Sequence, residues 1–395
     1  MLAVMGDVVG RGAALVGAAF RAPPGRRRPS VRRVVTMAVF LPAFLLVQAV
    51  HGLCLLLDEV LFPAYRKVKV NDPLIVLGVP RSGTTMVHRA LARDPNLTTF
   101  STWECLLAPS IIQRRAVFAL GRLDARLGRP LGRLLAWVEG HLFARLDDVH
   151  AMDLSAPEED YLALLPVLAC FILVVPFPTA EPLWRLARAD RDLPEGQRRR
   201  LMAFYRRLLQ RHLFVHGPDK RLLSKNAAFA GSAATLKETF PEARFLVCLR
   251  RPDKVVPSQL SAIADGVRLF AGDPDETLFP ARMPELLADY YHALLAALPP
   301  EGGPRHRVFA MEALKNDLAG TLKGAYRDLG LPLEDAFAAA LDEEAAAARA
   351  YRSRHAYRPP GPALDPESID ARFAPVYQRL DAAGLLAVPP RPKEA

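Results

Sequence analysis

The chain has 395 residues, of which 51% are hydrophobic and 24% are charged, enough apolar material for one large core or two ordinary ones. That composition excludes an intrinsically disordered chain, a collagen-like chain and a small disulfide scaffold. Lys and Arg outnumber Asp and Glu by 52 to 42, and the resulting net charge of +10 favours an anionic cofactor, a nucleic acid or an acidic membrane surface as partner.

The N-terminal region divides into two parts by composition. Residues 1–33 are rich in Gly, Ala, Pro and Arg, which predicts a flexible basic leader. Residues 34–57 follow without a formal charge and are long enough to cross a hydrocarbon core of ~30 Å. Pro42, Gln48 and His51 count against a span, and a helix lying on the membrane or packed beside the domain is the alternative. We therefore predict a membrane-contacting or transmembrane helix over residues 34–60.

A second uncharged stretch runs over residues 161–180. Its prolines, Pro166, Pro176 and Pro178, would break a spanning helix unless other groups satisfied the freed carbonyls. Just before it lies the acidic run Glu158 to Asp160, which is typical of a helix start, although charges beside an acceptor pocket could orient a substrate.

Elsewhere, short apolar runs alternate with helical segments. The runs at residues 74–77 and 245–249 each precede a helical pattern, which is typical of a parallel α/β fold with helices flanking the sheet. The four cysteines form no C-x-x-C pair, and no His is placed to complete a zinc site. We therefore expect neither a disulfide framework nor a metal.

The strongest local pattern is a strand, a tight loop and a helix over residues 74–93. Gly78 and Gly83 enclose four residues, the spacing of a phosphate-cradling loop whose amides face an anion at the helix N-terminus. A nucleoside triphosphatase would have Lys after the second Gly, but here Thr84 stands there and the basic group is Arg81, inside the loop. This points away from Mg-dependent phosphoryl transfer and towards a cofactor with a shorter anionic chain.

At this loop the sequence resembles the sulfotransferases, whose 5′-phosphosulfate loop has the form Pro-[Lys/Arg]-Ser-Gly-Thr-Thr, matched by residues 80–85. The resemblance, to the branch related to bacterial and protein-tyrosine sulfotransferases, covers about residues 70–330 and implies a P-loop-like sulfotransferase domain, which we predict over residues 70–385. It also implies 3′-phosphoadenosine 5′-phosphosulfate (PAPS) as co-substrate. The residues implied to bind PAPS in the loop are Arg81, Ser82, Gly83, Thr84 and Thr85.

A second motif lies about 165 residues further on. It follows the predicted strand at residues 245–249. In the family, an Arg at the end of the corresponding strand and a Ser eight positions later hold the 3′-phosphate, and Arg250 and Ser258 have that spacing. An Arg offers a planar fork of donors, and a Ser near a helix start adds a hydroxyl where the helix dipole favours an anion. The resemblance therefore implies that Arg250 and Ser258 bind the cofactor.

Sulfuryl transfer is an in-line displacement that needs a base for the acceptor and cations at the bridging oxygens, and no metal is obligatory. The resemblance assigns the cations to Arg81 and Lys225. It leaves two candidates for the base. Glu104 follows the loop helix about two residues later than the family spacing, and His150 is the rival because some branches use a histidine.

These assignments decide the topology of residues 161–180. Gly83 precedes that stretch while Lys225 and Arg250 follow it, and all three must meet one cofactor. A single span would separate them, so we expect a buried helix or the apolar wall of an acceptor pocket.

We therefore predict a membrane-associated sulfotransferase acting on a small-molecule or lipid-linked hydroxyl, with a hydrophobic alcohol, a phenol or a lipid-linked sugar as acceptor. A P-loop kinase is one alternative, disfavoured by Thr84 and by the lack of an acid ending the strand at residues 245–249. A non-catalytic membrane-tethered nucleotide-binding protein is another. Nucleic acid is not expected as a partner, because the excess charge lies partly in the leader without interleaved aromatic residues.

Overall fold

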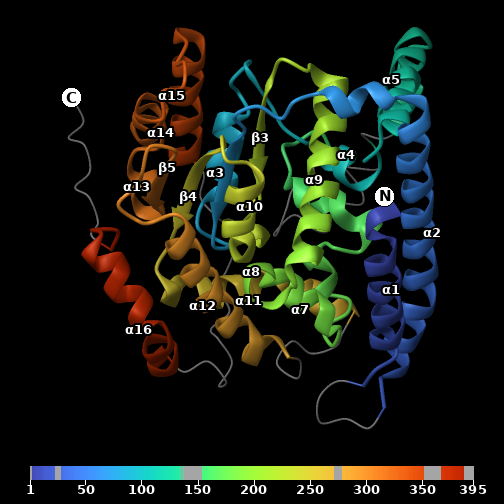
Figure 1. Ribbon diagram of the computed structural model, residues 1–395, viewed down its shortest axis with the longest axis horizontal. Coiled ribbons are helices and arrows are strands. Elements are labelled where there is room, and N and C mark those ends of the chain that lie inside the picture. Colours follow the sequence, from blue (N-terminus) through green and yellow to red (C-terminus); the bar gives the residue numbers. More distant parts are fainter. Residues whose placement is uncertain are drawn as a thin grey trace.

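A computed structural model describes residues 2–22, 28–134, 137, 154–270, 278–350 and 366–386. Its centre is a parallel sheet of five strands in the order β2-β3-β1-β4-β5 (Figure 1). The strands are β1 (Leu74–Gly78), β2 (Leu97–Thr98), β3 (Arg221–Lys225), β4 (Arg244–Leu249) and β5 (His306–Ala310). The predicted α/β fold with a parallel sheet flanked by helices is confirmed.

The central strand is apolar on both faces because helices cover both sides of the sheet. Leu74 and Val76 pack with α3, α14 and α15, whereas Ile75 and Leu77 pack with α9, α10 and α12 on the other face. The helices of the domain are α3 (Thr84–Leu91), α4 (Thr102–Leu106), α5 (Ile111–Arg126), α7 (Glu181–Ala187), α8 (Ala189–Asp192), α9 (Glu195–His216), α10 (Ala233–Thr239), α11 (Pro252–Phe270), α12 (Phe279–Ala297), α13 (Met311–Asn316), α14 (Leu318–Asp328), α15 (Asp335–Ala350) and α16 (Pro366–Ala382). The short 3₁₀ helices are η1 (Leu2–Val4), η2 (Pro63–Lys67), η3 (Asp160–Val167), η4 (Phe171–Val174) and η5 (Ala227–Ser232).

The N-terminal region differs from the flexible leader predicted for residues 1–33. Most of its described part forms helix α1 (Met5–Ala19), which packs beside α2 (Figure 1). Arg11 donates to the carbonyl of Val167 at 2.9 Å, and Asp7 accepts from Arg200 at 2.9 Å. These long-range contacts order a segment that its Gly content alone would leave weakly helical.

Helix α2 (Val31–Leu61) contains the predicted apolar helix. Among the described helices it is the one that is long and apolar enough to cross a membrane. It nevertheless packs along the domain, because buried polar side chains attach both of its ends. Arg33 donates to the carbonyls of Ala18 and Phe270 at 2.9 and 2.7 Å, and Asp58 pairs with the buried Arg211 at 2.9 Å.

The second apolar stretch forms no spanning helix. Its described elements are the short η3 and η4, most of whose side chains are buried against the core. The expectation that residues 161–180 are buried in the domain and do not span a membrane is therefore confirmed, and their role as the wall of an acceptor pocket stays a prediction.

Candidate functional site

The loop between β1 and α3 has the conformation of an anion cradle. Gly83, with a φ of 92°, precedes α3, and no side chain caps the first amides of that helix. Arg81 has a φ of 66°, which is uncommon for a residue with a side chain. A Cβ at Gly78 would overlap the carbonyl oxygen of Cys248, so only glycine lets the loop leave the sheet here. The first amides of α3 are therefore available to an anion.

The structure brings the two predicted motifs together. Because β1 and β4 are neighbours, the loop after β1 meets the start of α11 after β4. Arg81 Nε donates to Ser258 Oγ at 3.1 Å, and Arg250 Nη1 donates to the carbonyl of Arg81 at 3.2 Å. Tyr291 holds the turn by donating to the carbonyl of Arg250.

Arg250 also has a donor that the protein does not satisfy. Its Nε is buried and has no hydrogen-bond partner among the described residues. An unsatisfied buried donor costs roughly 1–3 kcal/mol, so its presence points to an acceptor that the protein itself does not supply. The buried hydroxyl of Ser258 lies in the same corner.

Lys225 lies at the carboxyl end of β3, opposite Val76 of β1. Its ammonium group is almost fully buried and pairs with the carboxylate of Glu159. The adjoining Asp160 is fixed by hydrogen bonds, accepting from Tyr205 at 2.7 Å and from Ser224 at 3.1 Å. Burial raises the pKa of Asp160 to about 6 although these hydrogen bonds oppose the shift.

Glu104, the acid predicted as base, lies in a different set of contacts. At the start of α4 it forms a capping box with Ser101, and its other oxygen is 3.4 Å from Nε of the fully buried Arg114 and 2.6 Å from Nε2 of His216. Burial alone would raise the pKa of Glu104, but Arg114 and the hydrogen bond from His216 hold it well below its usual range. A carboxylate held in its ionised form is a weak proton acceptor.

Glu104, His212 and His216 place three potential metal ligands close together, with the ligand atoms within 4.8 Å of one another. Arg114 already fills the cationic role there, since Nη1 of Arg114 donates to Nδ1 of His212 at 3.2 Å. The donor set therefore fits a buried ion pair better than a metal ion. His150, the other predicted base, lies outside the described residues.

Sequence reasoning thus located Arg81, Ser82, Gly83, Thr84, Thr85, Lys225, Arg250 and Ser258 at one edge of the sheet. It did not single out Glu159 as a partner of Lys225. The signal in the sequence was the acidic run at residues 158–160. Such a run is also typical of an ordinary helix start, so it did not single out Glu159. The contact with Lys225 joins segments 66 residues apart, which no local pattern reports.

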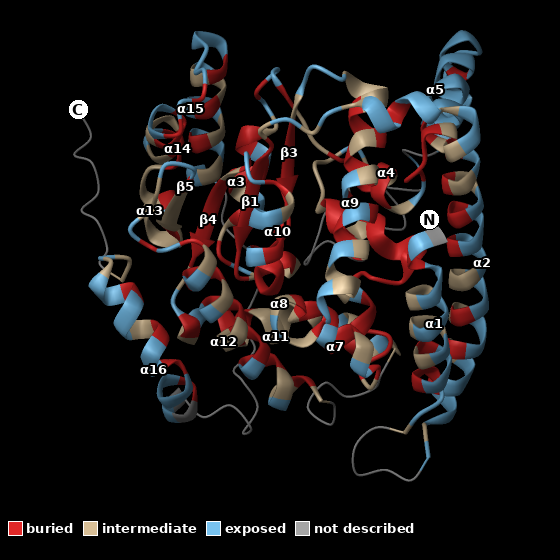
Figure 2. Cartoon of the chain, in the orientation of Figure 1, coloured by how far each residue is buried: buried red, intermediate tan, exposed pale blue. Residues whose placement is uncertain are grey.

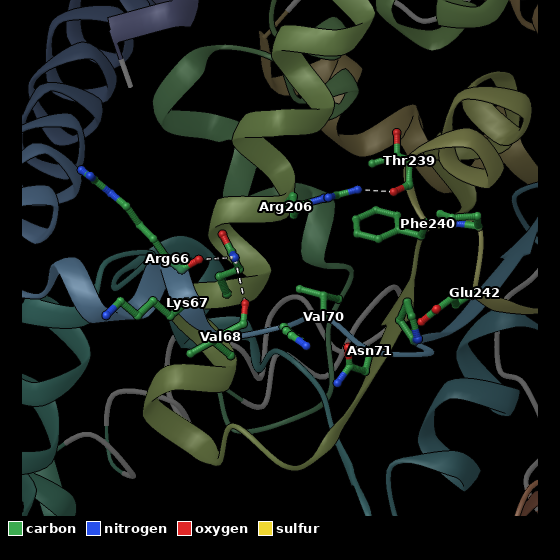
Figure 3. Close-up of a pocket in the computed structure, with 13 residues that line it drawn as sticks. Arg66, Lys67, Val68, Val70, Asn71, Arg206, Thr239, Phe240 and Glu242 are labelled. Atoms are coloured by element: carbon green, nitrogen blue, oxygen red, sulfur yellow. Dashed lines mark hydrogen bonds between the residues drawn. The ribbon is translucent and has the colours of Figure 1, made fainter.

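A cavity of about 330 Å³ lies elsewhere, at the amino ends of the strands (Figure 3). Pro73 precedes β1 and Glu242 precedes β4, and both line it together with Arg66, Lys67 and Arg206. The loop and Arg250 follow the carboxyl ends of the same strands, where ligands of open parallel sheets bind. The cavity is therefore separate from the candidate site.

Comparison with known proteins agrees with this geometry. The sulfotransferase family model matches residues 73–335, about two thirds of the chain. The solved sulfotransferase STF1 from Mycobacterium tuberculosis H37Rv is similar at 20% identity, with a TM-score of 0.66, over 93% of this chain and 91% of that chain. Sulfotransferase STF9 from Mycobacterium avium is similar at 18% identity, with a TM-score of 0.67, over 95% of each chain. No curated protein matches. The two structures show the shared fold, and the match to the family model shows that the chain belongs to the sulfotransferase family.

Proposed function

We propose that this protein transfers a sulfuryl group from PAPS to a hydroxyl of an apolar or lipid-linked acceptor. Family membership supports sulfuryl transfer in general. The contact between Arg81 and Ser258 carries the proposal of PAPS, because it joins a 5′-phosphosulfate-type loop to a 3′-phosphate-type motif in one site. Two anion-binding corners side by side fit a nucleotide with phosphates at both its 5′ and 3′ positions.

Each part of the donor has matching residues. The amides of Gly83, Thr84 and Thr85 would hold the 5′-phosphosulfate at the N-terminus of α3, with Ser82 fixing the loop by donating to the carbonyl of Val79 at 2.6 Å. The unsatisfied Nε of Arg250 and the hydroxyl of Ser258 would hold the 3′-phosphate. Arg250 would then gain the acceptor that it lacks.

In PAPS the sulfuryl group is bonded to an oxygen of the 5′-phosphate. When the acceptor hydroxyl attacks sulfur, this bond breaks and the oxygen leaves with the nucleotide. Arg81 and Lys225 are proposed to stabilise the negative charge that develops on this oxygen, the role that a divalent metal and a Lys share in P-loop kinases. Lys225 is suited to this role because it is buried, which strengthens its interaction with a nearby anion.

We propose Glu159 as the base in place of Glu104. Glu159 contacts Lys225 directly, whereas Glu104 is committed to Arg114 and His216. When the bound donor draws the Lys225 ammonium towards its leaving oxygen, the Glu159 carboxylate loses its partner and can accept the proton of the attacking hydroxyl. His150 stays a second candidate from the sequence.

An apolar acceptor is supported by the surroundings of Glu159. Tyr161 follows it in the chain, and the mostly buried, apolar stretch from residue 161 to residue 174 is proposed as a wall of the acceptor pocket. The apolar helix α2 packs against η3, and this contact supports a membrane-contacting helix near the proposed acceptor side. We therefore propose a membrane-associated enzyme and a hydrophobic alcohol, phenol or glycolipid as acceptor.

The test is transfer of labelled sulfate from PAPS to a panel of phenols, sterols and glycolipids, with formation of 3′,5′-adenosine bisphosphate followed in parallel. The expected result is acceptor-dependent release of the bisphosphate, lost in Lys225→Ala. Release of phosphate from ATP with Mg²⁺, with no response to PAPS, would favour the kinase alternative.

A further inference from the structure

From Arg115 onward, helix α5 and the turn after it form an arm that is exposed along its length, although Arg115 and Phe118 at its base contact rings of the domain. We call residues 115–134 the α5 arm. Every residue in it is exposed except Asp124. Asp124 accepts from the amides of Leu131 and Gly132 at 2.7 and 3.0 Å, which orders the turn after α5. The arm is therefore a folded projection rather than a loose loop, and it projects beyond α2 in Figure 1.

The arm carries large apolar side chains in water. Five leucines between positions 120 and 134 are 50% to 67% exposed, namely Leu120, Leu123, Leu127, Leu131 and Leu134. In α5 and its last turn, positions 120, 123 and 127 follow a helical period and form one stripe. A contiguous exposed apolar stripe on a folded element marks a surface that binds something.

The charge beside this stripe has one sign. Arg122, Arg126, Arg129 and Arg133 are exposed, while the acidic residue of the arm, Asp124, is buried and bound to backbone amides. In α5 itself, Arg122 and Arg126 lie roughly a third of a turn from the leucine stripe. The arm therefore combines apolar and cationic surface without an exposed acid between residues 115 and 134.

The outward face of α2 extends the same surface. Helix α5 packs against α2, and both lie at one margin of the molecule (Figures 1 and 2). Every exposed residue of α2 between positions 34 and 57 is apolar, including Val39, Leu46 and Leu53. At ~1.5 Å per residue, this face is about 36 Å long.

A spanning orientation of α2 conflicts with its contacts. Arg33 near one end and Asp58 near the other both bind the domain, so a bilayer wrapped around α2 would also have to enclose domain side chains that are polar. A helix lying flat with its outer face on the lipid keeps these contacts and covers the exposed apolar side chains.

We propose that the α5 arm and the outward face of α2 dock the protein on the surface of a bilayer that contains anionic lipids. The apolar side chains enter the interface, and the arginines bind headgroup phosphates. A bilayer fits better than a protein partner because it offers an extended apolar layer and negative charge in one plane. The inference rests on this surface and not on the sulfuryl-transfer reaction.

The test is co-sedimentation of the full chain with vesicles of phosphatidylcholine, with and without phosphatidylglycerol. The wild type should bind more tightly when phosphatidylglycerol is present. The triple variant Arg122→Ala, Arg126→Ala, Arg133→Ala should lose about 100-fold of that affinity, since each interfacial Arg contributes about fivefold. Leu123→Ser with Leu127→Ser should weaken binding as well.

A matched control removes three exposed arginines from the opposite margin, Arg327, Arg349 and Arg372 of α14, α15 and α16. This control should bind vesicles like the wild type, and all variants should keep the wild-type circular dichroism spectrum. Equal losses in the arm and control variants, or no vesicle binding by the wild type, would overturn the proposal. A wild-type dimer that the leucine variants dissociate, without vesicle binding, would identify a protein interface instead.

Discussion

Replacing Glu104 by Gln separates two accounts of this acid. The family resemblance makes Glu104 a candidate base, about two residues past the family spacing, and a base variant would fold normally and react slowly. The structure instead pairs Glu104 with Arg114, whose side chain is completely buried. Gln keeps the shape of the side chain but removes its charge, so Arg114 would be left as a buried cation without a counter-charge.

The magnitude follows from that burial. Breaking a buried ion pair by removing one partner typically costs about 3–5 kcal/mol. Arg114 would keep its hydrogen bond to the carbonyl of Ala108 at 3.0 Å, but that carbonyl carries no net charge. We therefore expect Glu104→Gln to lower the free energy of unfolding by about 3 kcal/mol or more, enough to threaten a domain of ordinary stability.

Urea denaturation followed by circular dichroism measures this loss, and a double-mutant cycle with Arg114→Met isolates the pair. The double variant should be more stable than Glu104→Gln alone, because it contains no unpaired buried charge. In parallel, Glu159→Gln should lower kcat ~10²- to 10⁴-fold, the usual effect of losing a positioned base, with affinity for 3′,5′-adenosine bisphosphate little changed.

The reverse pattern would make Glu104 the base. If Glu104→Gln unfolds within about 1 kcal/mol of the wild type and loses a hundredfold or more in kcat, Glu104 is the base as its position in the sequence predicts. Full activity in Glu159→Gln would contradict the proposed role of Glu159 even if Glu104→Gln proved unstable.

Three further predictions concern Gly78 in the loop, Arg250, which is proposed to bind the 3′-phosphate, and the buried acid Asp160. Gly78→Ala should abolish nucleotide binding in calorimetry, because the new Cβ overlaps the carbonyl oxygen of Cys248; wild-type affinity would show that the loop relaxes freely. Arg250→Ala should weaken binding of 3′,5′-adenosine bisphosphate by about 1.5–3 kcal/mol and leave adenosine 5′-phosphosulfate nearly unaffected, whereas equal losses would mean that Arg250 acts through folding. Burial raises the pKa of Asp160 to about 6, above its unfolded value of about 3.9. The folded state therefore favours the protonated carboxyl, and this contribution to stability is complete below about pH 4 and is lost as the pH rises through about 6. In urea unfolding, the free energy of unfolding of Asp160→Asn minus that of the wild type should therefore increase by about 2 kcal/mol from about pH 4 to about pH 7. A difference that does not change with pH would contradict the raised pKa of Asp160.

Local patterns in the sequence predicted the sheet and the contact between the loop after β1 and the start of α11. The apolar runs at residues 74–77 and 245–249 became buried central strands, and the loop after the first run lies against the helix start that contains Ser258. The conformation of a strand-loop-helix unit is determined largely by its own residues. Recognising two such units in the sequence was therefore enough to predict that they contact each other.

The parts that the sequence missed depend on contacts between distant segments. Glu104 meets His216 across 112 residues, and this hydrogen bond adds to the charge of Arg114 in holding the pKa of Glu104 low. Helix α1 contains four glycines, so composition predicts a flexible leader, yet Asp7 and Arg11 bind Arg200 and the carbonyl of Val167. At α1, tertiary contacts therefore overrode the weak helix propensity of the local sequence.

The central claim is that one site binds a nucleotide through both its 5′ and its 3′ phosphate groups. Calorimetry of the full chain with 3′,5′-adenosine bisphosphate in the absence of metal, compared with ATP and Mg²⁺, tests it most directly. We expect the bisphosphate to bind more tightly, since Arg250 Nε and Ser258 have no 3′-phosphate to meet in ATP. Tighter binding of ATP with Mg²⁺ would contradict the PAPS assignment.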